Sequence, residues 1–203
     1  TEDTRIRAAL LTEAASRERG DFKDKDRIAT LLGQALDQPS IDWLVISDIA
    51  YLSGDIGDFE LQEKALLKMA DAALEAEGES YSESGSEFPI GHEFEGFERG
   101  RAACAVLWWK ICQLREQHLN RHEEALLAID RARDLLPNHD FLEMERIRLL
   151  EGMERPDEAL EVSPSNVPGV WKAQLALAAE LPQSAVITIL SEDSSTESSL
   201  GRS

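Results

Sequence analysis

Apolar residues recur along most of this 203-residue chain at steps of three and four, in short segments separated by glycine, proline and polar residues. An α-helix has about 3.6 residues per turn, so this spacing places the apolar side chains on one helical face. The sequence therefore predicts an all-α fold built from short amphipathic helices. The expected helices lie at about 4–19, 25–36, 41–53, 60–76, 101–119, 122–136, 141–150, 156–162, 171–180 and 182–190.

The apolar stripes and the residues at the helix ends give more specific expectations. Ser40 can accept a hydrogen bond from a backbone amide, so we expect it at the N-cap of the third helix. Pro39 and Pro137 end the helices that precede them, because proline cannot continue the helical hydrogen-bond ladder. The residues predicted to face the core are Ile6, Ala9, Leu10 and Ala14 in the first helix and Ile41, Leu44, Val45, Asp48, Ile49 and Leu52 in the third.

Short sequence motifs recur at the expected helix boundaries. Gly-Asp-Phe occurs at 20–22 and at 57–59, a spacing of 37 residues, and each copy lies between two expected helices. Glu-Glu-Ala-Leu at 123–126 and Asp-Glu-Ala-Leu at 157–160 are 34 residues apart, and each lies near the start of the second helix of its pair. Helix pairs that repeat at such a period are typical of an α-solenoid, in which each pair packs against the next.

These motifs resemble those of the tetratricopeptide repeat, a helix-turn-helix unit of about 34 residues. Gly20 and Gly57 resemble its turn glycine, Ala125 and Ala159 its close-packing alanine, and Pro137 its terminal proline. Glycine tolerates left-handed backbone angles, and alanine lets two helices approach closely. The resemblance covers about residues 4–190 apart from one insertion. It implies a right-handed α-solenoid of about five helix-turn-helix units.

The expected organisation has four parts. Residues 1–76 form two helical hairpins, and 99–190 form three more, of which the last two are short. Residues 77–98, an acidic insertion with glycine, serine and phenylalanine, break the helical pattern. Its aromatic residues either plug the end of a helix pair or lie over the groove as a lid or linear motif. The Ser/Glu-rich tail at 191–203 has too little apolar surface to fold and is expected to be disordered.

Composition restricts the class of partner. Acidic residues outnumber basic ones by 40 to 21, giving a formal charge of −19, which argues against binding to nucleic-acid phosphates. No apolar run reaches the roughly 18 residues that a membrane span needs, and the chain does not begin like a signal peptide. We therefore expect a cytoplasmic protein without membrane insertion. Cys104 and Cys112 are expected to be buried, reduced thiols.

Motifs for catalysis are missing from the sequence. It contains no glycine-rich phosphate loop, no Cys-x-x-Cys and no nucleophile elbow, so we expect neither an enzyme nor a bound cofactor. His118 and His122 have the spacing of metal ligands, but only on a continuous helix. An expected turn at 119–121 separates them and favours an ordinary solvated pair. A helical enzyme or metal-dependent regulator with a site near these histidines is the alternative function.

The resemblance implies a protein-interaction adaptor or chaperone that binds a peptide or helix of another protein. Its concave surface would be lined by the first helix of each pair. The subfamily that grips a C-terminal carboxylate uses a lysine and asparagines; Lys110 and Arg148 supply charge here, but the asparagines are missing. A basic or amphipathic segment is therefore the expected partner. Aligning each unit on its turn glycine or alanine gives the candidate partner-binding residues Arg7, Ser47, Tyr51, Lys110, Gln117 and Arg148.

Overall fold

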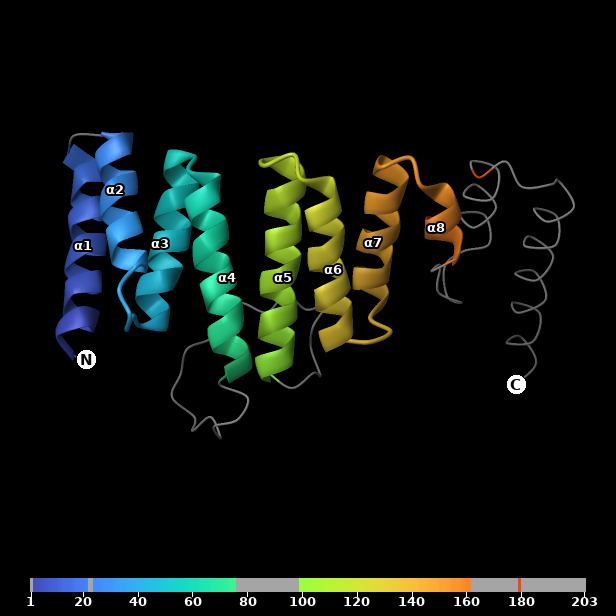
Figure 1. Ribbon diagram of the computed structural model, residues 1–203, viewed down its shortest axis with the longest axis horizontal. Coiled ribbons are helices and arrows are strands. Elements are labelled where there is room, and N and C mark those ends of the chain that lie inside the picture. The colour runs from blue at the N-terminus through green and yellow to red at the C-terminus, as the bar shows by residue number, and fades with distance from the viewer. Residues whose placement is uncertain (1, 22–23, 76–98, 162–178, 180–203) are drawn as a thin grey trace, which may run out of the picture. The chain divides into compact units, whose positions relative to one another are not determined.

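The computed structural model describes residues 2–21, 24–75, 99–161 and 179 (Figure 1). Every element within these ranges is an α-helix, which confirms the all-α prediction for the described part of the chain. The predicted insertion at 77–98, the helices at 171–180 and 182–190 and the tail at 191–203 lie outside the described residues. The helices are α1 (Glu2–Asp21), α2 (Lys25–Leu36), α3 (Trp43–Ile56), α4 (Phe59–Glu75), α5 (Arg99–Gln117), α6 (His122–Leu135), α7 (Asp140–Gly152) and α8 (Pro156–Glu161).

The chain divides into two compact units, Thr1–Leu135 and Leu136–Ser203. In the first unit, α1 pairs with α2, α3 with α4 and α5 with α6, and successive helices run in opposite directions (Figure 1). Neighbouring hairpins pack through α2 with α3 and α4 with α5, and α1 also contacts α3. In the second unit, α7 pairs with the short helix α8. The largest fully buried side chains of the first unit are Ile28, Leu32, Ile49, Leu107, Ile111 and Ile129.

The second Gly-Asp-Phe motif forms the turn between α3 and α4, as predicted. Gly57 adopts a left-handed conformation with φ of 82°. Its amide donates to the Gly54 carbonyl (3.1 Å) and the Asp58 amide to the Ser53 carbonyl (2.9 Å), the two bonds of a Schellman motif. The Asp58 carboxylate then accepts a hydrogen bond from the Leu61 amide (3.1 Å) and caps α4. With Gly57 as its C-cap, α3 ends at Ile56, two residues beyond the predicted terminus at Gly54.

A residue with positive φ also lies in the turns of two later hairpins, without glycine. Asn120 and Glu154 have φ of 53° and 58°. Each lies two residues before the first residue of the second helix of its hairpin. The hydrogen bonds of the Gly57 turn recur at Glu154, whereas at Asn120 the Arg121 amide donates to the Arg115 carbonyl (2.8 Å). The amide of Glu154 donates to the Glu151 carbonyl (3.0 Å) and that of Arg155 to the Leu150 carbonyl (2.9 Å), as at Gly57. Asn120 and Glu154 are 34 residues apart, which matches the spacing of the two alanine motifs.

The first Gly-Asp-Phe motif does not form this turn, so the prediction for it was wrong. Gly20 and Asp21 belong to the last turn of α1. The cap of α2 is Asp24, whose carboxylate accepts a hydrogen bond from the Arg27 amide (3.1 Å). Asp24 and the capping residue Asp58 are 34 residues apart, so the structural period here is 34 and not the 37 of the motif.

The predicted buried face of α1 was also wrong. Ile6 and Leu10 are 52% and 63% exposed, whereas Ala8, Thr12 and Ala15 are buried. The Thr12 hydroxyl donates to the Ala8 carbonyl (3.0 Å), so its polar group is satisfied inside the helix packing. Small side chains let α1 lie close to its neighbours, and this close approach outweighs burial of the larger residues.

The start and the core face of α3 differ from prediction as well. The N-cap is Asp42, and the Ser40 hydroxyl instead accepts a hydrogen bond from Arg5 Nε of α1 (3.1 Å). Leu44 is 69% exposed and Asp48 is also exposed, although both were assigned to the core. The residues of α3 that are buried are Ile46, Ile49, Ala50, Leu52, Ser53 and Ile56.

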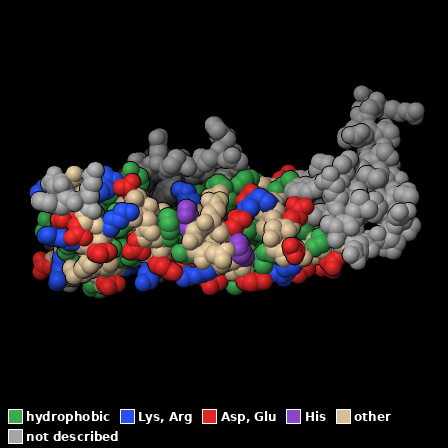
Figure 2. Space-filling view, turned by 90° about the horizontal axis from the view of Figure 1, so that it is seen from above, with side chains coloured by type: hydrophobic (Ala, Val, Ile, Leu, Met, Phe, Trp, Pro, Cys, Tyr) green, Lys and Arg blue, Asp and Glu red, His purple; other side chains and the backbone are tan. Residues whose placement is uncertain are grey.

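A partly buried ion-pair cluster joins α4 to the hairpin of α5 and α6. Glu63 of α4 is buried and accepts hydrogen bonds from Arg115 Nε (2.5 Å) and Arg121 Nη1 (3.0 Å). Arg121 also bonds Glu60, and this hydrogen bond is the main cause that raises the pKa of Arg121 above its ordinary value. Acidic and basic side chains are mixed on the surface at these ends of the helices (Figure 2).

We predict opposite effects for two glycine substitutions. Gly57→Ala should lower the free energy of unfolding by about 1 kcal/mol, because an L-residue is strained at positive φ. Gly33 lies inside α2, and an added Cβ there would meet nothing within 4 Å. Gly33→Ala should therefore raise stability by about 0.5–1 kcal/mol. Urea denaturation followed by circular dichroism measures both, and equal effects would contradict the turn assignment.

Removal of the buried carboxylate at Glu63 should be costly. Glu63→Ala takes the buried carboxylate away from Arg115, which keeps its hydrogen bond to the Glu124 carbonyl (3.0 Å) and a longer contact with the Glu124 carboxylate (3.8 Å). We expect a loss of about 2–3 kcal/mol in the free energy of unfolding, because most of the charge compensation of Arg115 is lost. Glu13→Ala is the matched control, because Glu13 pairs with Arg17 on the exposed surface of α1. Exposed pairs contribute little, so this control should change stability by less than about 0.5 kcal/mol. Urea denaturation of the two variants compares them directly.

Candidate partner-binding groove

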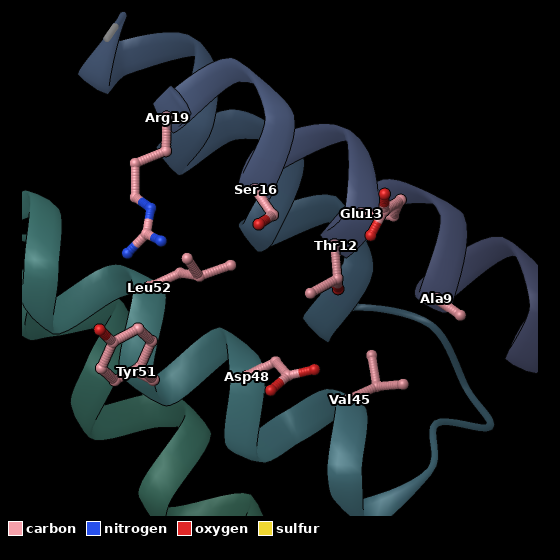
Figure 3. A pocket seen from close by; sticks show the side chains of 9 residues that line it. All are labelled: Ala9, Thr12, Glu13, Ser16, Arg19, Val45, Asp48, Tyr51 and Leu52. Atoms are coloured by element: carbon pink, nitrogen blue, oxygen red, sulfur yellow. The ribbon is translucent and has the colours of Figure 1, made fainter. Parts of the chain in front are cut away.

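A hollow of about 290 Å³ lies between α1 and α3, the first helices of two successive hairpins (Figure 3). On each helix the lining residues recur about every three or four positions, as 9, 12/13, 16 and 19 on α1 and 45, 48 and 51/52 on α3, so each set lies on one helical face. Thr12 and Leu52 are buried and form its floor, whereas Tyr51 is 65% exposed at its rim. The full lining is Ala9, Thr12, Glu13, Ser16 and Arg19 of α1 and Val45, Asp48, Tyr51 and Leu52 of α3.

Arg19 closes one end of the hollow by bridging the two helices. Its Nη1 atom lies 3.1 Å from Asp55 Oδ2, and its Cζ atom lies 5.7 Å from the ring centroid of Tyr51. Hydrogen bonds with Tyr51 and then with Asp55 raise the pKa of Arg19 above its ordinary value. The guanidinium is therefore charged and directed toward α3 (Figure 3), which restricts the orientation of the Tyr51 ring.

The two carboxylates that line the hollow differ in their surroundings. Glu13 of α1 accepts a hydrogen bond from Arg17 Nε (2.9 Å) on the same helix. Asp48 of α3 is exposed and makes no hydrogen bond or ion pair with any other residue in the described part of the chain. Figure 3 shows Asp48 on the α3 wall and Glu13 on the α1 wall. Asp48 is thus available for a cation from outside the chain.

One of the six predicted partner-binding residues, Tyr51, lines this hollow. Ser47 is half-buried on α3, and Arg7 of α1 and Lys110 of α5 are exposed, but none of these three belongs to the lining. The remaining two are Gln117, which is exposed at the end of α5, and Arg148, which lies on α7 in the second unit with its Nη2 atom 3.4 Å from Glu145.

Sequence reasoning missed Asp48 and Arg19 as residues of the hollow. Asp48 was placed in the apolar stripe of α3, although it is the only charged residue in that stripe. A charged residue inside an apolar stripe can indicate that this part of the helix face is not covered, and this was the available signal. Arg19 carried no such signal, because its role depends on contact with α3, two helices further along the chain.

The histidines of the alternative site lie on either side of a turn, as predicted. His118 follows α5 and stacks on Phe59, with ring centroids 4.0 Å apart and an interplanar angle of 19°. His122 begins α6, and its Nε2 atom lies 3.0 Å from Asn120 Oδ1. Within the described ranges, no group of three or more His, Cys, Asp and Glu side chains could hold a metal ion. No contact in this region specifically favours the metal-dependent alternative.

The cysteines agree with expectation. Cys104 and Cys112 are buried and are not in a disulfide, and the Cys104 thiol donates to the Ala70 carbonyl of α4 (3.6 Å). Both thiols therefore belong to the packing of α5. Among the helices described, none combines the length and apolar character needed to cross a membrane.

Comparison with protein-family models and with curated protein sequences finds no match for this chain.

Proposed function

We propose that this chain is a protein–protein interaction module, an adaptor or chaperone-like protein with the architecture of a right-handed, tetratricopeptide-like α-solenoid. The recurring left-handed turns at Gly57, Asn120 and Glu154 support a repeated hairpin unit. Contacts between α1 and α3 and between α2 and α4 support hairpins that stack in register. In such a stack the first helices share one surface, which is suited to a peptide or helix of another protein.

The observation that carries the proposal is the hollow between α1 and α3, with large apolar side chains exposed beside it. Tyr51 at its rim and Leu44 one turn before Asp48 are 65% and 69% exposed. Exposed aromatic and aliphatic side chains around a concavity are typical anchors of protein interfaces, because a partner removes them from water. Arg19 holds Tyr51 in place, which reduces the entropy lost on binding.

The remaining candidate residues extend the proposed surface along the first helices. Arg7, Ser47, Lys110 and Gln117 are exposed or half-buried on α1, α3 and α5, and we propose them as further partner contacts. Arg148 lies on α7 in the second unit, and we propose it as a separate candidate contact. The buried thiols Cys104 and Cys112, which are not in a disulfide, support a reducing, cytoplasmic setting for this activity.

The proposal is tested by affinity capture and mass spectrometry with two surface variants. We expect Leu44→Ser combined with Tyr51→Ala to reduce recovery of the partner by about tenfold or more, because both side chains would be anchors. Leu127→Ser is the matched control: Leu127 is 62% exposed but lies on the second helix α6. Circular dichroism confirms that the variants are folded. Equal recovery with both variants would show that the face of α1 and α3 is not the binding surface.

A further inference from the structure

We infer that the hollow between α1 and α3 takes an amphipathic helical segment of another protein, which places a lysine or arginine opposite Asp48. This inference rests on the proposed function and names the chemistry of its partner. The charge of the hollow, the apolar side chains of Ala9, Val45 and Leu52 among its polar lining, and the spacing of exposed residues along α3 support this partner.

Asp48 is the charged group of the hollow that lacks an internal partner. Glu13 has Arg17 at 2.9 Å and Arg19 has Asp55 at 3.1 Å, whereas Asp48 has no partner among the described residues. A partner carboxylate would be repelled at this position, and an uncharged side chain would leave the aspartate uncompensated. A cation is therefore the complementary group, and the chain charge of −19 would steer a basic segment toward it.

The walls around Asp48 favour a cationic group on a long apolar stem. Ala9 of α1 and Val45 of α3 line the hollow beside the carboxylate, and Leu52 contributes to its floor (Figure 3). Lysine and arginine combine an aliphatic stem, which can pack on such residues, with a charged head that can reach a carboxylate. The volume of about 290 Å³ accommodates only a few side chains, so the rest of the partner lies on the surface.

The spacing along α3 indicates the pattern of the partner. Leu44, Asp48 and Tyr51 follow one another at steps of four and three, so they lie along one face and span about 10 Å. A helix lying alongside α3 has the same rise per residue. Its side chains at i and i+4 would meet Leu44 and Asp48, one apolar and one basic. Beyond Tyr51, the pair formed by Arg19 and Asp55 ends the hollow.

Three synthetic peptides test the inference on the full chain. Each is a fluorescein-labelled 14-residue amphipathic helix with the same leucine stripe. The position four residues after a leucine carries lysine in the first peptide, glutamine in the second and glutamate in the third. Fluorescence anisotropy measures their affinities, and amide chemical shifts of the ¹⁵N-labelled chain locate the bound peptide. We expect the lysine peptide to bind most tightly, to shift resonances of α1 and α3, and to weaken as salt is raised.

Variants of Asp48 distinguish a specific contact from general charge attraction. Asp48→Asn should lower the affinity for the lysine peptide by about fivefold and leave the affinity for the glutamine peptide unchanged. Asp48→Lys should reverse the preference in favour of the glutamate peptide. Asp71→Asn is the matched control, because Asp71 is an exposed aspartate of α4 outside the hollow. Asp48 is itself exposed, so neither of its substitutions disturbs the core.

The outcomes separate this inference from the proposed function. The role of Asp48 would be overturned if Asp48→Asn and Asp71→Asn weakened binding of the lysine peptide equally. It would also be overturned if neither substitution changed the affinity for this peptide. If all three peptides bound α1 and α3 with equal affinity and Leu44→Ser lowered each affinity, the proposed interaction surface would be supported. The inferred preference for a basic partner would then be wrong. If no peptide bound, the inference would fail, and affinity capture with the Leu44 and Tyr51 variant would still decide the proposed function.

Discussion

Each described hairpin turn at Gly57, Asn120 and Glu154 depends on one residue that adopts a positive φ between two helices. Four carbonyls at the end of every helix have no partner within it, and this conformation directs the following amides back to them. The chain reverses within a few residues, so the second helix lies against the first. A pair of short helices cannot cover its own apolar surface, and in the first unit the next hairpin covers it.

Two acidic residues of the first unit show how burial changes the role of a carboxylate. Glu63 is enclosed by Arg115 and Arg121, so its charge is compensated inside the structure and holds α4 to the next hairpin. Asp48 is exposed at the hollow and has no compensating group among the described residues. The high acidic content of the sequence does not distinguish these cases. The difference lies in which helices meet, and only the fold supplies that information.

The sequence predicted where helices begin and end, but it assigned the wrong buried face to α1 and, in part, to α3. The bounds of α2, 25–36, agree with prediction because its apolar spacing is regular and Pro39 follows closely. For α1, the stripe of larger apolar residues pointed to Ile6 and Leu10, whereas close packing selects Ala8 and Ala15. The hollow could be predicted only in part. Tyr51 was identified from its place in the repeat, but Arg19 depends on a contact between helices that are not consecutive.

The cluster around Glu63 also has a consequence for the link between α4 and α5. The chain leaves α4 at Glu75 and enters α5 at Arg99, and these two helices pack against each other and are joined through Glu63 and Arg115. Glu63 and Arg115 are 52 positions apart in the sequence, so α4 and α5 are held together by their own side chains and not only by the chain that links them. The entropy cost of closing a loop rises only slowly with its length. A longer link between Glu75 and Arg99 would therefore add little entropic cost to the packing of α4 on α5.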